Sequence, residues 1–326
     1  MKQSFIITAF AGLVIFFFAQ PVAGQEPSGA YALRLSPFFG MMYGQAEEIV
    51  YPSGTKAPLL SQLLWDMKPV FYYGLLLEFS QINPREKWGF FSNFSLKQGI
   101  PGNSGSMEDR DWQSVENTNL TDYSKHNNYT RELFFLDFSA GLSFPFNRVL
   151  LFKTFINISY MRFSFYGKDG YGTYAVKISD GHYYPIDENP ILVDFSGKVI
   201  SYTQEWLTVA PGVSLGCFFH PRFYTELSFM ASPLVLCFDL DEHKELNDQY
   251  RDEMRGGVLF EPGLMLSYTI NKWLAVSWEF SWRKISGTKG LTYKRNPIGT
   301  GTYEQKGEAG AGLSIINTNL SLKVRL

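Results

Sequence analysis

Charged residues are scarce in this chain of 326 residues, because Lys, Arg, Asp and Glu together make up only 18% of it. An ordinary soluble domain has roughly a quarter. The formal net charge is −2, and no basic patch with stacking aromatics occurs, which argues against a nucleic-acid partner. The chain has two cysteines, Cys217 and Cys237. They lie at unequal distances from the turn-forming residues 220–222, so we expect no disulfide between them.

Long hydrophobic runs are also missing after the first residues. Lys2 precedes an apolar run over 5–19, and the small residues 22–24 follow. This order is typical of a secretory signal peptide over 1–24, with the mature chain at 25–326. The run is shorter than the ~20 residues that a spanning helix needs. We therefore expect an exported protein without a spanning helix.

Aromatic residues are abundant, at 17% of the chain with 29 Phe and 19 Tyr. An exported, aromatic-rich chain without spanning helices favours an all-β fold, a transmembrane β-barrel of the outer membrane. Apolar and polar residues alternate over 136–144, 274–283 and 320–326, as expected for strands with one face toward lipid and one toward the barrel interior. A secreted β-sandwich is the competing fold class.

The spacing of turns predicts ten antiparallel strands. A barrel of this size is largely filled by its own side chains, which disfavours a small-solute channel. Outer-membrane barrels keep short turns in the periplasm and long loops outside, so all the long polar stretches should face the exterior. Short connections are expected near 83–85, 146–148, 220–222 and 271–272, and long ones near 45–57, 103–129, 167–198, 241–256 and 288–304.

Two of these long stretches carry residues suited to hydrolysis. Asp109 and Asp111 lie two positions apart in the first, and Asp241 and His243 in the second. Residues two apart on a strand share a face, so both pairs can point into one opening. Asp241 would orient the imidazole of His243, which would remove a proton from water, while Asp109 and Asp111 would share a proton or hold that water. The alternative is that these are solvated acidic loops.

Other catalytic patterns are weaker. The chain has no His-Glu-x-x-His motif and no cysteine cluster, so we expect neither a metal ion nor another cofactor. Ser124 could act as a nucleophile with His126 or His243, but we interpret it as a polar residue beside the opening.

Several stretches, in order, resemble the omptins, a family of outer-membrane endopeptidases with a ten-stranded barrel. The Asp-x-Asp-Trp and Asp-x-Asp-Glu-His segments are specific in combination. The matching segments are 48–51 with 61–63, 107–112, 121–126, 162–165 and 239–243.

The resemblance implies an aspartyl-type protease with an Asp–Asp couple at Asp109 and Asp111 and an Asp–His dyad at Asp241 and His243. It also implies cleavage of polypeptides at Arg or Lys, because two acidic positions of the family's substrate pocket match Glu48 and Asp239. Ser124 and His126 match family residues near the opening that are not the nucleophile.

Omptins also require lipopolysaccharide, and Arg162 matches one of the family's basic contacts. Alternation places Arg162 on the lipid-facing side near the outer rim, where it can meet a headgroup phosphate. The second basic position of the family is occupied by Glu205 in this sequence, so a lipopolysaccharide requirement stays an open expectation. We expect a monomeric enzyme with polypeptide substrates. A non-enzymatic adhesin or structural barrel is the alternative.

Overall fold

The computed structural model describes residues 30–52, 57–82, 84–85, 87–243 and 247–326. The predicted signal peptide lies outside them, as does Asn83 of the first predicted turn. None of the described segments is a helix that could span a membrane. The strands are β1 Tyr31–Tyr51, β2 Ser61–Gln81, β3 Gly89–Gly99, β4 Gly102–Asp111, β5 Asp122–Pro145, β6 Leu150–Tyr174, β7 Lys177–Ser179, β8 His182–Tyr183, β9 Ile191–His220, β10 Phe223–Ser232, β11 Val235–His243, β12 Asp248–Arg255, β13 Val258–Thr269, β14 Leu274–Ser286, β15 Lys289–Arg295 and β16 Glu304–Arg325.

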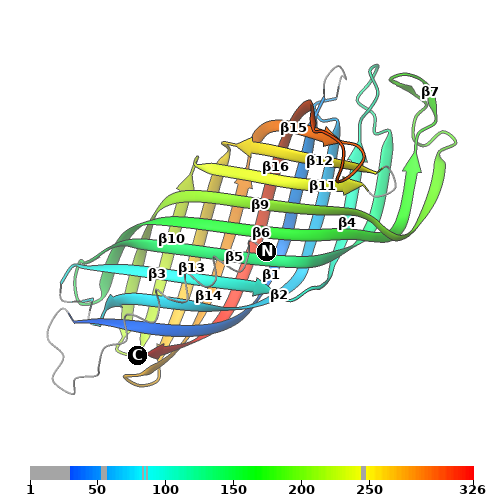
Figure 1. Cartoon of the computed structure of the whole chain (residues 1–326). Helices are drawn as coiled ribbons and strands as arrows, with labels where there is room; N and C mark the ends of the chain where they lie inside the picture. Colours follow the sequence, from blue (N-terminus) through cyan, green and yellow to red (C-terminus); the bar gives the residue numbers. More distant parts are fainter. Residues whose placement is uncertain (1–29, 53–56, 83, 86, 244–246) are drawn as a thin grey trace.

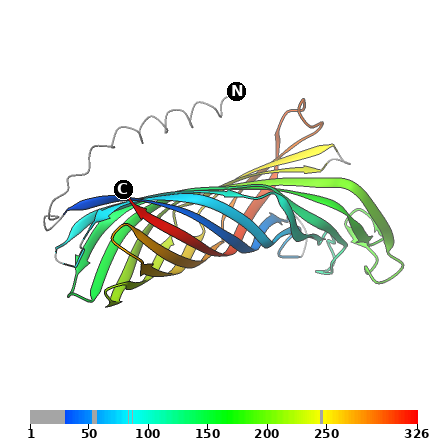
Figure 2. The ribbon, with the colours of Figure 1, turned by 90° about the horizontal axis from the view of Figure 1, so that it is seen from below.

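Fourteen of these strands form one antiparallel sheet that closes into a barrel (Figure 1), and β7 with β8 forms a separate small hairpin. Two residues interrupt the strand between β3 and β4, β10 and β11, β12 and β13, and β14 and β15. Each such pair continues one wall strand, so the described ring has ten wall strands. The last strand, β16, pairs with β1 and closes the ring (Figure 2). The predicted ten-stranded antiparallel barrel is confirmed.

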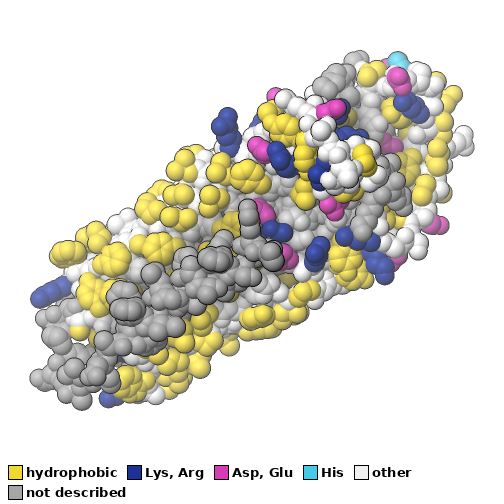
Figure 3. All heavy atoms as spheres, in the orientation of Figure 1, with side chains coloured by type: hydrophobic (Ala, Val, Ile, Leu, Met, Phe, Trp, Pro, Cys, Tyr) yellow, Lys and Arg dark blue, Asp and Glu magenta, His cyan; other side chains and the backbone are white. Residues whose placement is uncertain are grey.

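Alternation along each strand sorts the two faces of the wall. On β5, Phe138 and Leu142 are exposed on the outside, whereas Ser143 is buried inside. Apolar side chains cover much of the barrel body in Figure 3, and charged side chains gather toward the end that carries β7 and β15. A sheet with this outer surface buries its apolar side chains in lipid, as the sequence pattern predicted.

The connections predicted to be long are mostly strand, which corrects the sequence-based boundaries. Within 103–129, for example, only 112–121 lie outside β4 and β5, and within 288–304 only 288 and 296–303 lie outside β15 and β16. Beyond the membrane both faces of the sheet meet water, so these strand ends lose the apolar face that identifies a strand in lipid. The wall strands of 21 to 30 residues far exceed the ~10 needed to cross hydrocarbon.

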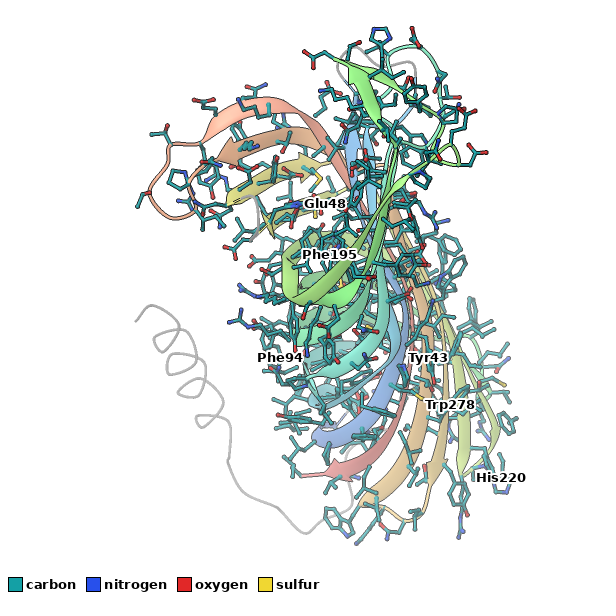
Figure 4. All side chains as sticks on the ribbon, turned by 90° about the vertical axis from the view of Figure 1, so that its right-hand side faces the viewer. Tyr43, Glu48, Phe94, Phe195, His220 and Trp278 are labelled. Atoms are coloured by element: carbon teal, nitrogen blue, oxygen red, sulfur yellow. The ribbon has the colours of Figure 1, made fainter. Side chains whose placement is uncertain are left out.

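An apolar layer fills the interior below the mouth. Trp65 from β2 stacks on Tyr202 from β9, with ring centroids 5.4 Å apart, and on Phe165 from β6 at 5.7 Å. Neither β6 nor β9 is a neighbour of β2 in the ring, so the Trp65 ring meets the other two rings across the interior. Phe163 and Trp206 are also fully buried in this layer. The apolar layer separates the two ends of the barrel. Figure 4 shows Glu48 toward one end and His220 at the other.

Candidate active site

The first acidic tract lies on β4, whose pleat separates its side chains. Asp109 and Asp111 share one face because they are two residues apart. Glu108 and Arg110 take the other face, where Arg110 Nη2 donates to Glu108 Oε2 at 2.6 Å. Ser61 on the adjacent β2 donates to Asp109 Oδ1 at 3.4 Å. The strand therefore presents the two aspartates together.

The second tract lies on β11 and holds a close dyad. Nε2 of His243 lies 2.5 Å from Oδ2 of Asp241, and the Asp241 side chain is only 2% exposed. The ring of Tyr250, on the adjacent β12, meets the His243 imidazole edge-on, with centroids 5.6 Å apart. The carboxylate and the tyrosine ring hold the imidazole orientation, leaving Nδ1 for other contacts.

The two tracts converge on the same opening. In the ring, β5, β6 and β9 separate β4 from β11. Nevertheless Asp109 interacts electrostatically with both Asp241 and His243, and His243 with Asp111. The four predicted catalytic residues therefore face one another at one end of the barrel.

Burial and mutual repulsion shift the pKa values of these groups. Burial, and then the neighbouring Asp111, raise the pKa of Asp109 well above its usual range. Burial raises the pKa of Asp111 to about 6. Burial opposes protonation of His243, but Asp241, Asp109 and Asp111 outweigh it and raise the pKa of the imidazole to about 9. A couple of carboxylates that resists double ionisation lies beside an imidazole that attracts a proton.

Glu48 and Asp239 lie in the same acidic site, and each keeps a carboxylate oxygen without a partner. Glu48, on β1, is buried, and its Oε2 accepts no hydrogen bond from the described residues. Oδ2 of Asp239 accepts from the Tyr202 hydroxyl at 2.9 Å, while its Oδ1 has no partner among them. Burial, followed by repulsion from Asp241, Asp239, Asp252 and Asp109, raises the pKa of Glu48 well above its usual range. Unpaired buried oxygens of this kind suit a cationic ligand.

Asp252 is a member of the site that sequence reasoning missed. It lies on β12 directly opposite Asp239, is 1% exposed, and its Oδ1 has no partner among the described residues. Burial raises the pKa of Asp252 to about 7. The sequence pattern predicts a long connection over 241–256, whereas in the structure β12 pairs with β11 there and places Asp252 opposite Asp239.

Ser124 and His126 form a second pair beside the aspartates. Ser124 on β5 is in register with Asp109 on β4. Nδ1 of His126 lies 2.6 Å from the carbonyl oxygen of Asp169, and its Nε2 lies 3.0 Å from the Ser124 hydroxyl. The carbonyl makes Nδ1 the donor, so a neutral ring accepts the serine proton at Nε2. The structure thus places both residues at the opening, next to the Asp109 position.

Arg162 lies apart from this site, within the membrane-facing wall. Its Nη1 lies 2.6 Å from Glu205 Oε1 and its Nε lies 3.2 Å from Glu132 Oε2. Two carboxylates therefore already surround the guanidinium that sequence analysis assigned to lipopolysaccharide.

Among the residues that the structure describes, no group of three or more His, Cys, Asp or Glu side chains is arranged to hold a metal ion. The acidic groups instead lie around the His243 imidazole at the mouth of a closed, membrane-type β-barrel.

The sequence profile of the omptin family matches residues 30–326. The chain therefore belongs to the omptin family of outer-membrane proteases, and it is a multi-pass β-barrel of the cell outer membrane. The outer membrane protease OmpT from Escherichia coli has a similar structure, with a TM-score of 0.77 and 19% identity, over 90% of this chain and 97% of that chain.

Two further solved structures match with lower TM-scores. The translocator domain of the autotransporter NalP from Neisseria meningitidis has a TM-score of 0.36 and 9% identity, over 99% of this chain and 95% of that one. The transport unit of the autotransporter AIDA-I from Escherichia coli has a TM-score of 0.32 and 12% identity, over 95% and 93%. No curated protein matches the chain.

Proposed function

We propose that this protein is an endopeptidase that cleaves exposed polypeptides at Arg or Lys, with water as the nucleophile. The observation that carries the proposal is the Asp241–His243 dyad, 2.5 Å between Oδ2 and Nε2, facing the Asp109–Asp111 couple across one opening. A barrel that only needs to stay in the membrane gains nothing from unpaired buried carboxylates, which cost free energy.

In this mechanism the neutral form of His243 is the general base. Asp241 accepts a hydrogen bond from the Nε2–H group of His243, which leaves the basic lone pair on Nδ1. Nδ1 removes a proton from a water molecule, whose oxygen attacks the scissile carbonyl carbon. Asp241 then stabilises the imidazolium, which can return the proton to the leaving amine. No covalent acyl intermediate forms.

Asp109 and Asp111 have a different role, because they resist double ionisation. One proton shared between them provides a hydrogen-bond donor, and the remaining carboxylate provides an acceptor. Such a couple can hold the attacking water and oppose developing negative charge at the substrate. The nearby Ser124 hydroxyl contributes a further polar group beside the opening.

Specificity for basic residues would come from Glu48 and Asp239. A guanidinium that reaches their unpaired oxygens gains charge-assisted hydrogen bonds and relieves carboxylate repulsion. A neutral side chain would leave the same oxygens buried and unsatisfied, so it would bind less well.

We also propose that the barrel acts as a monomer, because ring closure leaves no free edge in the wall for a second copy to pair with. Outer-membrane lipid surrounds it. The ion pairs of Arg162 with Glu132 and Glu205 argue that any response to lipopolysaccharide is weak.

The experiment uses the refolded full chain and a quenched peptide that contains Arg-Arg. His243→Ala and Asp109→Ala should each lower kcat by about 10²–10⁴, while circular dichroism shows an intact barrel. His220→Ala, at the end of β9 beside the far turn, is the matched control and should retain parental turnover.

Equal turnover by the parent and both variants would reject the mechanism. A folded parent that cleaves no basic peptide, with or without lipopolysaccharide, would instead support the second reading, a non-enzymatic adhesin or structural barrel.

A further inference from the structure

A cavity of about 340 Å³ opens at the end of the barrel opposite the active site. The turns between β2 and β3, β9 and β10, and β13 and β14 contribute to its walls, so it lies at the short-turn, periplasmic end. Among the described residues, seven basic side chains line it, against the single carboxylate of Glu78. The basic residues are Arg34, Arg85, Lys153, Arg222, Lys272, Lys323 and Arg325.

This basic excess is local. The neighbouring interior cavity of about 270 Å³ has a balanced lining, with five acidic and four basic side chains, and the whole chain has a net charge of −2. In that interior cavity the acidic and basic side chains largely neutralise one another. Those of the periplasmic cavity do not, so that cavity attracts anions.

The deepest cations of the cavity are already paired. Lys323 Nζ lies 3.1 Å from Glu78 Oε1, and Lys153 Nζ lies 2.6 Å from Glu226 Oε2. These pairs stabilise the floor. Arg34 lies directly opposite Glu78 in the β1–β2 register, and its Nη1 donates to the Ser80 hydroxyl at 2.6 Å, which holds the guanidinium in place.

Aromatic rings support the cations nearer the opening. The guanidinium carbon of Arg85 lies 4.2 Å from the centroid of the Phe218 ring, and Nζ of Lys272 lies 5.1 Å from that of Trp273. A ring binds the face of a guanidinium and leaves its N–H edges available. No carboxylate among the described residues pairs with Arg85 or Lys272. Both side chains can therefore donate to a ligand.

We propose that this cavity is a binding site for a phosphate-bearing anion. Guanidinium groups match phosphate oxygens in bidentate pairs, and the volume lies at the lower end of the range for small-molecule sites. The exposed Arg222 and Lys272 form the rim, and Arg34 and Arg85 form the inner contacts. The ligand is either a soluble phosphate compound or the phosphate headgroup of an inner-leaflet lipid.

The test is calorimetric titration of the refolded full chain with inorganic pyrophosphate at about 50 mM salt, where screening is moderate. The double variant Arg34→Gln/Arg85→Gln should weaken binding about 100-fold, because two charge-assisted contacts are lost. The matched control Arg251→Gln/Lys306→Gln removes two positive charges from pairs with Glu253 and Glu304 outside the cavity and should bind like the parent.

Lys272→Gln tests the same site if the double variant does not fold, with an expected loss of about threefold. A parallel titration with nanodiscs that contain phosphatidylglycerol separates the two sources. Pyrophosphate binding lost in Arg34→Gln/Arg85→Gln supports a soluble ligand, and lipid binding alone lost in that variant supports a headgroup.

No binding of either probe by the parent would overturn the proposal. The same conclusion follows if the cavity variants and the Arg251→Gln/Lys306→Gln control lose affinity equally, because that result describes general charge attraction. Peptidase activity is a separate readout at the other end and does not enter this test.

Discussion

The two ends of the barrel interior carry side chains of opposite charge, and they differ in how these side chains are paired. At the mouth, carboxyl groups gather on β1, β4, β11 and β12, and Glu48, Asp239 and Asp252 each keep an oxygen without a partner among the described residues. At the periplasmic end, the deep cations Lys153 and Lys323 are paired with glutamates. Burying an unpaired charge costs several kcal/mol. The mouth thus keeps buried carboxyl oxygens that no described residue compensates, and we attribute them to the proposed chemistry.

The apolar layer around Trp65, Tyr202 and Phe165 keeps these ends apart. It supports the acidic site from below. Trp206 Nε1 donates to Gln204 Oε1 at 2.8 Å, Gln204 Nε2 donates to the Tyr202 hydroxyl at 2.9 Å, and Tyr202 donates to Asp239. Changes at the mouth should thus alter catalysis without altering the far cavity.

The largest effect is expected from Asp241→Asn. The amide keeps the shape but cannot stabilise the imidazolium or impose the productive tautomer, so kcat should fall about 10³–10⁴-fold. Stopped assays with the Arg-Arg peptide measure this. Glu242→Gln, on the opposite face of β11, is the control and should retain turnover. If both variants turn over equally, Asp241 does not orient the base.

A smaller effect is expected from Asp239→Asn, in the selectivity of cleavage. Loss of one charge-assisted contact should lower the ratio of kcat/KM for an arginine peptide over its citrulline analogue about 10–100-fold. Asp248→Asn, whose carboxylate pairs with Lys294 at 2.6 Å, is the control. An unchanged ratio in Asp239→Asn would place the basic-residue pocket elsewhere.

Asp252 should make that selectivity depend on pH. Its pKa is raised to about 7, so the carboxylate gains charge as the pH rises from 6 to 8, and the arginine-to-citrulline ratio should rise several-fold. The ratio cancels the titration of His243, which affects both peptides. Asp252→Asn should flatten the profile. A profile that stays equally steep in this variant would assign the dependence to another group.

The smallest effect is expected from Arg162→Gln on the outer wall. Because Glu132 and Glu205 already neutralise the guanidinium, the activation ratio with and without rough lipopolysaccharide should change less than about threefold. Glu205→Arg removes one of these carboxylates and adds a cation, so it should increase the activation ratio. Complete loss of activation in Arg162→Gln would show that the arginine exchanges its carboxylates for lipid phosphate.

Sequence reasoning succeeded where a short pattern is sufficient. Strand alternation over 136–144 and 274–283 predicted which face meets lipid, and turn spacing predicted ten wall strands. The two-residue spacing within 109–111 and 241–243 predicted shared faces, which the pleat provides. Sequence reasoning failed at Asp252. The ends of β11 and β12 have polar residues on both faces, a pattern that predicts a loop.

The sequence alone determined the wall: its strand number, its lipid-facing side and the residue types available at the mouth, because these follow from periodicity along a single strand. The tertiary structure decided which of those residues meet. Register between neighbouring strands placed Asp252 opposite Asp239 and Ser124 opposite Asp109. Ring closure then brought β4 within electrostatic reach of β11, an outcome that depends on pairing across the whole barrel and appears in no local pattern.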